Sequence, residues 1–322
     1  MGLPLNSDVL AVTVHGFSSL GIILVWSLGG HHGDSVRLSH GHSIEPIHFA
    51  AAAALWSAVV HFCTWLADPL QEATLFSTSR WIDYFVSAGL MVVPAAVFLG
   101  QRDVYMLGAA AFSVSGTMLV ASTCEALVFD FNNEAGAEAS DVPRRSSTWI
   151  GAAMVQVAGL VMLFSQSGGT ESSRVWTAVV ALAMFAGVAV LSNSVMKRHK
   201  WQAVAVTGAA TVAYAATWVA LALTATRSAN AAVAGVLIAT HALFGAAFLV
   251  LGWCFNATVR ANPVQYDRAN AALSVFAKGT MHWLLVFNDR EAHPHIWDSS
   301  VSLVLAVGVA VSAAFLFLCA DG

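Results

Sequence analysis

The sequence predicts an all-α fold, a polytopic bundle of helices that crosses a membrane many times. Hydrophobic residues make up 58% of the 322 residues and charged residues only 10%, whereas charged residues make up about 25% of a typical soluble domain. Apolar runs of roughly 20 residues, the length that spans a bilayer, follow one another with short loops between them. The formal net charge of −4 argues against a nucleic-acid partner.

Ten apolar runs are long enough to span the bilayer. They lie at residues 8–28, 44–67, 73–100, 103–127, 148–166, 174–196, 201–225, 230–256, 263–288 and 299–319. Small residues are dense within them, as is usual where membrane helices pack closely. A polar loop, FDFNNEAGAEASDVPRRSS, separates the fourth run from the fifth.

The distribution of Lys and Arg predicts the orientation, because basic residues gather in cytoplasmic loops. With the N-terminus inside, eight basic residues lie on the inner side of the membrane and five on the outer side. The cluster KRHK at 197–200 contributes most of this difference. We therefore expect a multi-pass membrane protein with a cytoplasmic N-terminus.

Lys278 is the residue least expected inside a membrane. It lies about ten residues from the nearer end of the run 263–288, and a charge at that depth costs roughly 2.5–3.5 kcal/mol on insertion scales. A buried lysine can form a Schiff base, because desolvation favours the neutral amine that attacks a carbonyl. The alternative is a lysine paired with a buried carboxylate, as in transporters, and the residue alone does not distinguish the two.

Asp83 and Ser274 are expected at one depth. Asp83 lies about ten residues into the run 73–100, and Ser274 about eleven residues into the run 263–288. Both runs lead from the inside to the outside, and a rise of 1.5 Å per residue puts both residues roughly 15 Å deep. A carboxylate and a hydroxyl are therefore expected just on the cytoplasmic side of the Lys278 amine, where the carboxylate could serve as a counterion.

Two histidines are expected near this level. His15 lies about seven residues into the first run, and His61 lies about seven residues from the inner end of the second. A single histidine in an apolar helix is more often a core residue, but together with the groups above these two suggest a polar pocket that could hold a proton. Nearer the cytoplasmic face, a structural ion network is favoured for three charged residues: Arg80, Glu125 and Asp267.

These residues, in this order, resemble the heliorhodopsins, a retinal-binding family whose N-terminus is cytoplasmic. DRANAALSVFAK is similar to the last family helix, with Ser274 one turn before Lys278. SRWIDY resembles the Arg-Trp-x-Glu-Tyr of family helix three, with Asp83 in place of the usual Glu. His15 fits the histidine of helix one, SAVVHF with His61 resembles helix two, and DVYMLGAAAFSVSGTML resembles helix four.

The resemblance implies a seven-helix rhodopsin-like core that binds all-trans retinal at Lys278 as a protonated Schiff base. Asp83 would be the counterion, supported by Ser274, and Ser57 would lie with the two histidines in a pocket that accepts the proton. Two further residues would border the chromophore: Trp218, in AATWVALAL, and His282, one turn beyond the lysine.

The chain departs from the family in its number of spans. The match covers 1–128 and 201–288, so we interpret 148–196 as an inserted helical hairpin and 299–322 as an extra C-terminal helix. A core of seven helices plus about three extra spans results, and a two-helix insertion keeps the orientation of all that follows. Asp83 is one methylene shorter than Glu, so a water could be needed between it and the Schiff base.

The expected function is light sensing in the lipid bilayer, without enzyme activity. Photoisomerisation of the retinal would drive a slow conformational signal to an unidentified signalling partner, and a homodimer is compatible with the sequence. Two alternatives stay open: a light-gated or light-driven proton conductor, and a cation- or proton-coupled transporter without retinal. The loop between residues 31 and 48 carries five histidines, but no CxxC or HExxH frames them, so we assign no metal site.

Impermeant labelling tests the orientation. In intact cells, a membrane-impermeant thiol reagent should label a cysteine placed beside His40, because that loop is expected outside. The reagent should not reach a cysteine placed beside Arg145, in the polar loop expected inside. The opposite pattern would invert the orientation and, with it, the depths assigned to Lys278 and Asp83.

Overall fold

The computed structural model describes most of the first half of the chain and two short parts of the second. The described residues are 11–20, 36–67, 73–130, 141–165, 212, 214–219, 221, 270, 273–275 and 277–279. Four long helices follow one another: α2 (Pro46–Ala67), α3 (Ala73–Phe98), α4 (Val104–Asp130) and α5 (Asp141–Ser165). The predicted helical class is confirmed for this part of the chain.

Three of these helices are long and apolar enough to cross a membrane. Their apolar stretches are His48–Ala67 in α2, Ser79–Phe98 in α3 and Val104–Ser122 in α4. Large apolar side chains on the same helices are exposed, for example Phe62 and Ile82. Exposed apolar side chains are stable against lipid and costly in water. The second, third and fourth predicted runs are therefore confirmed as helices of membrane-spanning length.

Two of the helices extend further into the polar loop than the sequence predicts. α4 continues to Asp130, and α5 begins at Asp141 rather than at residue 148. Hydropathy detects the apolar part of a helix, and polar helix ends carry no such signal. Pro143 lies in the first turn of α5, where a proline is tolerated because the first N–H groups of a helix have no partner within it.

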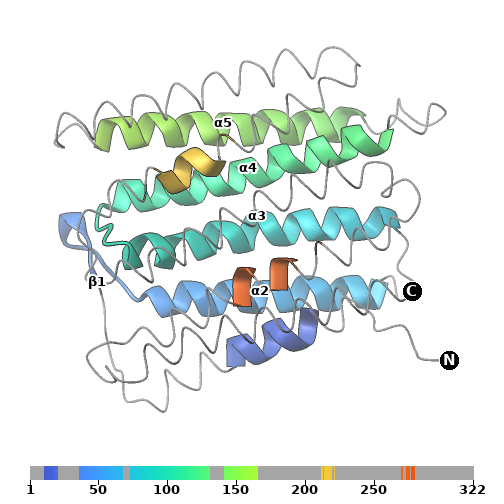
Figure 1. The fold of residues 1–322 in the computed structure, drawn as a ribbon, viewed down its shortest axis with the longest axis horizontal. Helices are drawn as coiled ribbons and strands as arrows, with labels where there is room; N and C mark the ends of the chain where they lie inside the picture. The colour runs from blue at the N-terminus through green and yellow to red at the C-terminus, as the bar shows by residue number, and fades with distance from the viewer. Residues whose placement is uncertain are drawn as a thin grey trace.

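Figure 1 shows α2, α3, α4 and α5 side by side in chain order, each packed against the next. The helical residues 11–20 lie beside α2, where the Ser19 hydroxyl donates to the Ala51 carbonyl at 3.4 Å. Residues 214–219 lie against α4, because the hydroxyls of Thr217 and Ser113 are 2.7 Å apart. The segment that carries Lys278 lies against α2 and α3.

A short β-hairpin, which the all-helical prediction did not include, covers the turn between α3 and α4. Strand β1 (Val36–Arg37) pairs antiparallel with β2 (Ser43–Ile44) around the 3₁₀ helix η1 (Ser39–Gly41). The Ser39 amide donates to the Arg102 carbonyl at 2.8 Å, which fixes the hairpin to that turn. Strands of two residues are too short to show the alternation by which a sequence reveals a strand.

Two glycines bring α4 and α5 into close contact. A Cβ atom on Gly116 would lie 2.7 Å from the Gly151 carbonyl oxygen, and a Cβ on Gly151 would lie 2.6 Å from that of Gly116. Neither position has room for a side chain. Small residues at a helix interface let the two backbones approach in this way.

This contact predicts that Gly116→Ala destabilises the protein by about 1–3 kcal/mol, the usual cost of adding a methyl group to a packed interface. Gly108→Ala is the matched control on the same helix, because a Cβ there meets nothing within 4 Å. The control should be neutral or slightly stabilising, since alanine favours the helix over glycine. Thermal unfolding of the purified variants in detergent measures both, and equal midpoints would show that the glycines do not set the α4–α5 distance.

Candidate functional site

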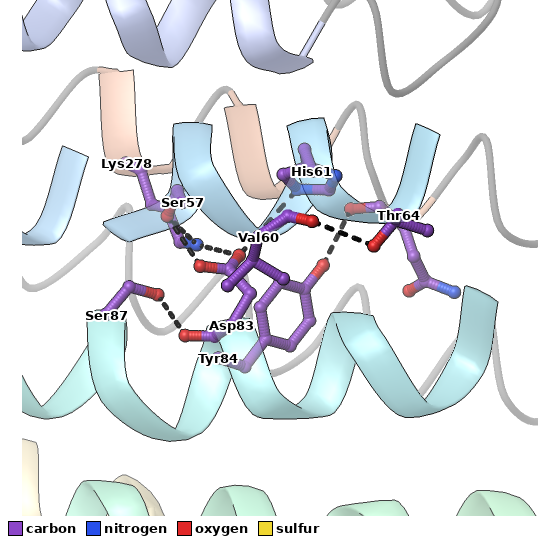
Figure 2. Close-up of polar contacts among 9 residues, drawn as sticks. Ser57, Val60, His61, Thr64, Asp83, Tyr84, Ser87 and Lys278 are labelled. Atoms are coloured by element: carbon purple, nitrogen blue, oxygen red, sulfur yellow. Dashed lines mark hydrogen bonds and ion pairs between the residues drawn. The ribbon is translucent and has the colours of Figure 1, made fainter. Parts of the chain in front are cut away.

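The centre of the candidate site is a buried ring of hydrogen bonds among Lys278, Asp83 and Ser57 (Figure 2). The Nζ of Lys278 donates to Oδ2 of Asp83 at 2.5 Å and to Oγ of Ser57 at 2.9 Å. The Ser57 hydroxyl donates in turn to Oδ1 of Asp83 at 2.6 Å. An amine, a hydroxyl and both oxygens of one carboxylate are thus joined in a closed network.

Helical spacing explains how two helices deliver these groups. Each helix carries three polar residues at intervals of three or four, which puts them on one face. On α2 they are Ser57, His61 and Thr64, and on α3 they are Arg80, Asp83 and Ser87. All six are buried. The two polar faces meet where α2 packs against α3, and Lys278 reaches the same point from a segment about 200 residues later.

Burial makes the pairing of these charges necessary. Asp83 and Ser57 are fully buried, and Lys278 is 9% exposed. An ion pair away from water keeps its charges only if each partner is matched and hydrogen-bonded, because desolvation of a lone charge costs several kcal/mol. Asp83 meets this condition with the Lys278 amine and the Ser57 hydroxyl, and its backbone carbonyl also accepts from the Ser87 hydroxyl at 2.7 Å.

Both predicted pocket histidines lie next to this network. Nε2 of His61 is 3.8 Å from Oδ2 of Asp83. The His15 ring is stacked on that of His61, with centroids 6.0 Å apart and an interplanar angle of 18°. Both histidines are buried. A line of neighbouring titratable side chains therefore runs from Lys278 through Asp83 and His61 to His15.

Of the two serines predicted for the site, Ser57 rather than Ser274 bonds the charged pair. The sequence places Ser274 as the hydroxyl that supports Asp83, and Ser57 among the histidines. In the structure the hydroxyl bonded to Asp83 and Lys278 is that of Ser57. Ser274 is buried, and its hydroxyl has no hydrogen-bond partner among the described residues. Asp83 contacts the free amine directly, and the water suggested between Asp83 and a Schiff base stays a prediction.

Tyr84 is a further residue of the site, and its contacts are not evident from the sequence. Its ring lies under the Lys278 amine, with Nζ 5.0 Å from the ring centroid. Its hydroxyl donates to the backbone carbonyl of Asn270 at 3.1 Å. In the sequence Tyr84 is the last residue of SRWIDY, directly after Asp83, and adjacent residues on a helix do not usually face the same neighbour.

The remaining predicted site residues are less completely described. Trp218 is buried, and its ring centroid lies 6.3 Å from that of Tyr214. Arg80 is buried with its guanidinium 5.7 Å from the ring centroid of Trp81. The side chain of Glu125, and the whole of Asp267 and His282, lie outside the described residues. The cytoplasmic ion network and the position of His282 therefore stay predictions.

Within the part of the chain that the structure describes, no three His, Cys, Asp or Glu side chains come close enough to hold a metal ion. In the histidine-rich region His48 lies 3.3 Å from the Glu45 carboxylate. His31 and His32 fall outside the described residues. The chemistry visible in the structure is thus that of an amine, a carboxylate and two imidazoles.

Comparisons of this chain with models of known protein families, with curated proteins and with solved structures found no match. The site is therefore interpreted from its own geometry. That geometry combines a primary amine, a carboxylate in direct contact with it, and neighbouring imidazoles that could exchange protons with the carboxylate.

A double-substitution experiment measures how strongly the two charges depend on each other. Asp83→Asn should destabilise the protein by about 3–5 kcal/mol, because it leaves the Lys278 charge buried without its partner. Adding Lys278→Met should recover most of this loss, because no charge is then left in the site. Thermal unfolding of the single and double variants, without retinal, gives the coupling between the two positions.

Asp103→Asn is the matched control, because Asp103 caps α4 by accepting from the Tyr105 amide at 2.8 Å and asparagine caps equally well. This control should unfold like the wild type. If the double variant instead loses as much stability as the sum of the losses in Asp83→Asn and Lys278→Met, the two residues do not form an ion pair.

Proposed function

We propose that the protein is a light-sensing retinal protein of the bilayer, with a rhodopsin-like core of seven helices and a cytoplasmic N-terminus. The observation that carries the proposal is the buried Lys278 amine in direct contact with the Asp83 carboxylate, 2.5 Å away and on another helix. A retinal protein needs this combination of an amine for the covalent link and a negative charge beside it. Residue order along SRWIDY and DRANAALSVFAK supports the same proposal.

The groups around the amine fit a linked retinal. An ammonium has three N–H donors, whereas a lysine nitrogen linked to retinal as a protonated Schiff base keeps one. That single donor can stay on Asp83, because the Ser57 hydroxyl bonds the carboxylate independently of the amine. The carboxylate therefore keeps two donors after the link has formed. The Ser274 hydroxyl, one turn before Lys278 and without a described partner, could serve as a further donor.

Retinal linked in this way absorbs visible light and isomerises. The protein residues hold it, balance its charge and take up its proton. Lys278 holds the chromophore, and Asp83 balances the positive charge on its nitrogen. His61, 3.8 Å from Asp83, and His15, stacked on His61, provide sites that could take up the released proton. Because these groups are buried, the proton would leave slowly, which suits a sensor that signals through a long-lived state.

The placement of residues 214–219 supports their assignment to the rhodopsin-like core. Thr217 pairs with Ser113 on the buried side of α4, so residues 214–219 join the core there. α5 also packs closely on α4, through Gly116 and Gly151.

Proton conduction is the second candidate, and the line from Lys278 through Asp83 and His61 to His15 favours it. The same line serves a light-driven conductor or a proton-coupled transporter without retinal, because the Lys278–Asp83 pair is complete without a chromophore. A conductor needs titratable groups that continue from this line to both faces of the membrane.

Colour tests the proposal. Purified protein incubated with all-trans retinal should absorb visible light, and Lys278→Ala should be folded and colourless. Lys200→Ala is the matched control, because Lys200 belongs to the basic cluster KRHK between two predicted spans, and it should keep the colour.

Three outcomes separate the candidates. A colourless wild type would reject the retinal proposal and leave the transporter. If Lys278→Ala still forms a visible pigment, and borohydride reduction fixes the retinal on another residue, Lys278 is not the attachment site. With a coloured wild type, sustained light-driven pH changes in a liposome suspension would identify a conductor, and their absence would identify a sensor.

A further inference from the structure

Tyr84 connects α3 to the helical segment of Lys278 at two points. Its hydroxyl donates to the backbone carbonyl of Asn270 at 3.1 Å, and its ring centroid lies 5.0 Å from Nζ of Lys278. Tyr84 follows Asp83 directly and is buried. Figure 2 shows its ring extending from α3 toward the Lys278 network. One side chain therefore contacts both the amine and the backbone that carries it.

Helix geometry explains how one tyrosine reaches both groups. Asn270 precedes Lys278 by eight residues, or about 12 Å along a helix axis. Side chains on a helix lean toward its N-terminus, so the long Lys278 side chain carries its amine back over the preceding turns. The contacts of Tyr84 with Nζ of Lys278 and with the Asn270 carbonyl put both groups within reach of one side chain.

A second aromatic ring restrains Tyr84 itself. The Trp81 ring meets that of Tyr84 edge-on, with centroids 5.6 Å apart and an interplanar angle of 83°. Edge-to-face packing is a favoured geometry for an aromatic pair. Trp81 is also buried. The Tyr84 ring is therefore held between Trp81 and the Lys278 amine and has little freedom to follow a movement of the Lys278 segment.

We infer that Tyr84 is a positioning residue, whose hydroxyl holds the Lys278 segment at the height at which the amine meets Asp83 and Ser57 together. A shift of that segment by one residue, about 1.5 Å, exceeds the spread of hydrogen-bond lengths. The amine would then lose one of its two acceptors. The inference does not depend on retinal, because the ring of hydrogen bonds forms with the free amine.

Solid-state NMR of the full-length protein in liposomes, without retinal, tests the inference. The chain has three lysines, Lys197, Lys200 and Lys278, so ¹⁵Nζ labelling gives few signals. The Lys278 signal is assigned as the one that is missing from the ¹⁵N spectrum of the Lys278→Arg variant. With the aspartate carboxyl carbons labelled with ¹³C, dipolar dephasing of this signal reports its contact with Asp83.

Tyr84→Phe keeps the ring and removes the hydroxyl. Without that hydroxyl, the Lys278 segment should shift along α3 by about 1.5 Å. The longer distance between Nζ of Lys278 and the Asp83 carboxyl carbon then appears as a loss of dephasing, because dipolar coupling falls with the cube of the distance. Tyr214→Phe is the matched control, because Tyr214 is also buried but packs against Trp218. It should leave the dephasing unchanged.

The thermal midpoints of both variants separate positioning from packing. A Tyr84→Phe protein that melts earlier but keeps wild-type dephasing would show that Tyr84 only packs, and would overturn the inference. An unchanged midpoint with unchanged dephasing would overturn it as well. Equal loss of dephasing in Tyr84→Phe and Tyr214→Phe would show a general loosening of the bundle and would also reject a specific role for the Tyr84 hydroxyl.

Discussion

The rest of the described structure depends on the pairing of one buried positive charge with one buried negative charge. Neither Lys278 nor Asp83 could stay ionised alone when buried, because a lone charge in a low-dielectric interior loses its solvation and gains no compensating interaction. Each therefore requires the other, and the requirement joins α3 to a segment about 200 residues further along the chain. The Ser57 hydroxyl extends the constraint to α2 by bonding both charged groups.

The surrounding elements can be understood as ways of meeting that requirement. α2 and α3 each place a polar stripe inside the bundle and leave large apolar side chains such as Phe62 and Ile82 outside. The hairpin Val36–Ile44 covers the turn between α3 and α4. On the other edge of α4, the glycine contact attaches α5. The polar centre is thus enclosed by packing that uses mostly apolar groups and backbone atoms.

The sequence indicated the membrane class and several of the right residues, but not all of their contacts. Lys278, Asp83, His15 and His61 stand out because a charged or titratable group in an apolar run is costly and rare. Depth along the helices brought Ser274 to the same level as Asp83, yet depth says nothing about rotation around the helix axis. That rotation decides that Ser57, rather than Ser274, bonds the carboxylate.

By itself, the sequence determined that α2, α3 and α4 are helical and apolar enough to cross a membrane, because hydropathy over roughly 20 residues is a local property. It also determined which buried residues need a partner, since the cost of an unmatched charge follows from its chemistry alone. Only the tertiary structure decided which residues are their partners. The Tyr84 hydroxyl meets the Asn270 carbonyl, and Gly116 meets Gly151, because helices far apart in the chain pack at one distance and one rotation. The distance and the rotation between two helices result from the packing of all side chains together, so the sequence of a single segment does not determine them.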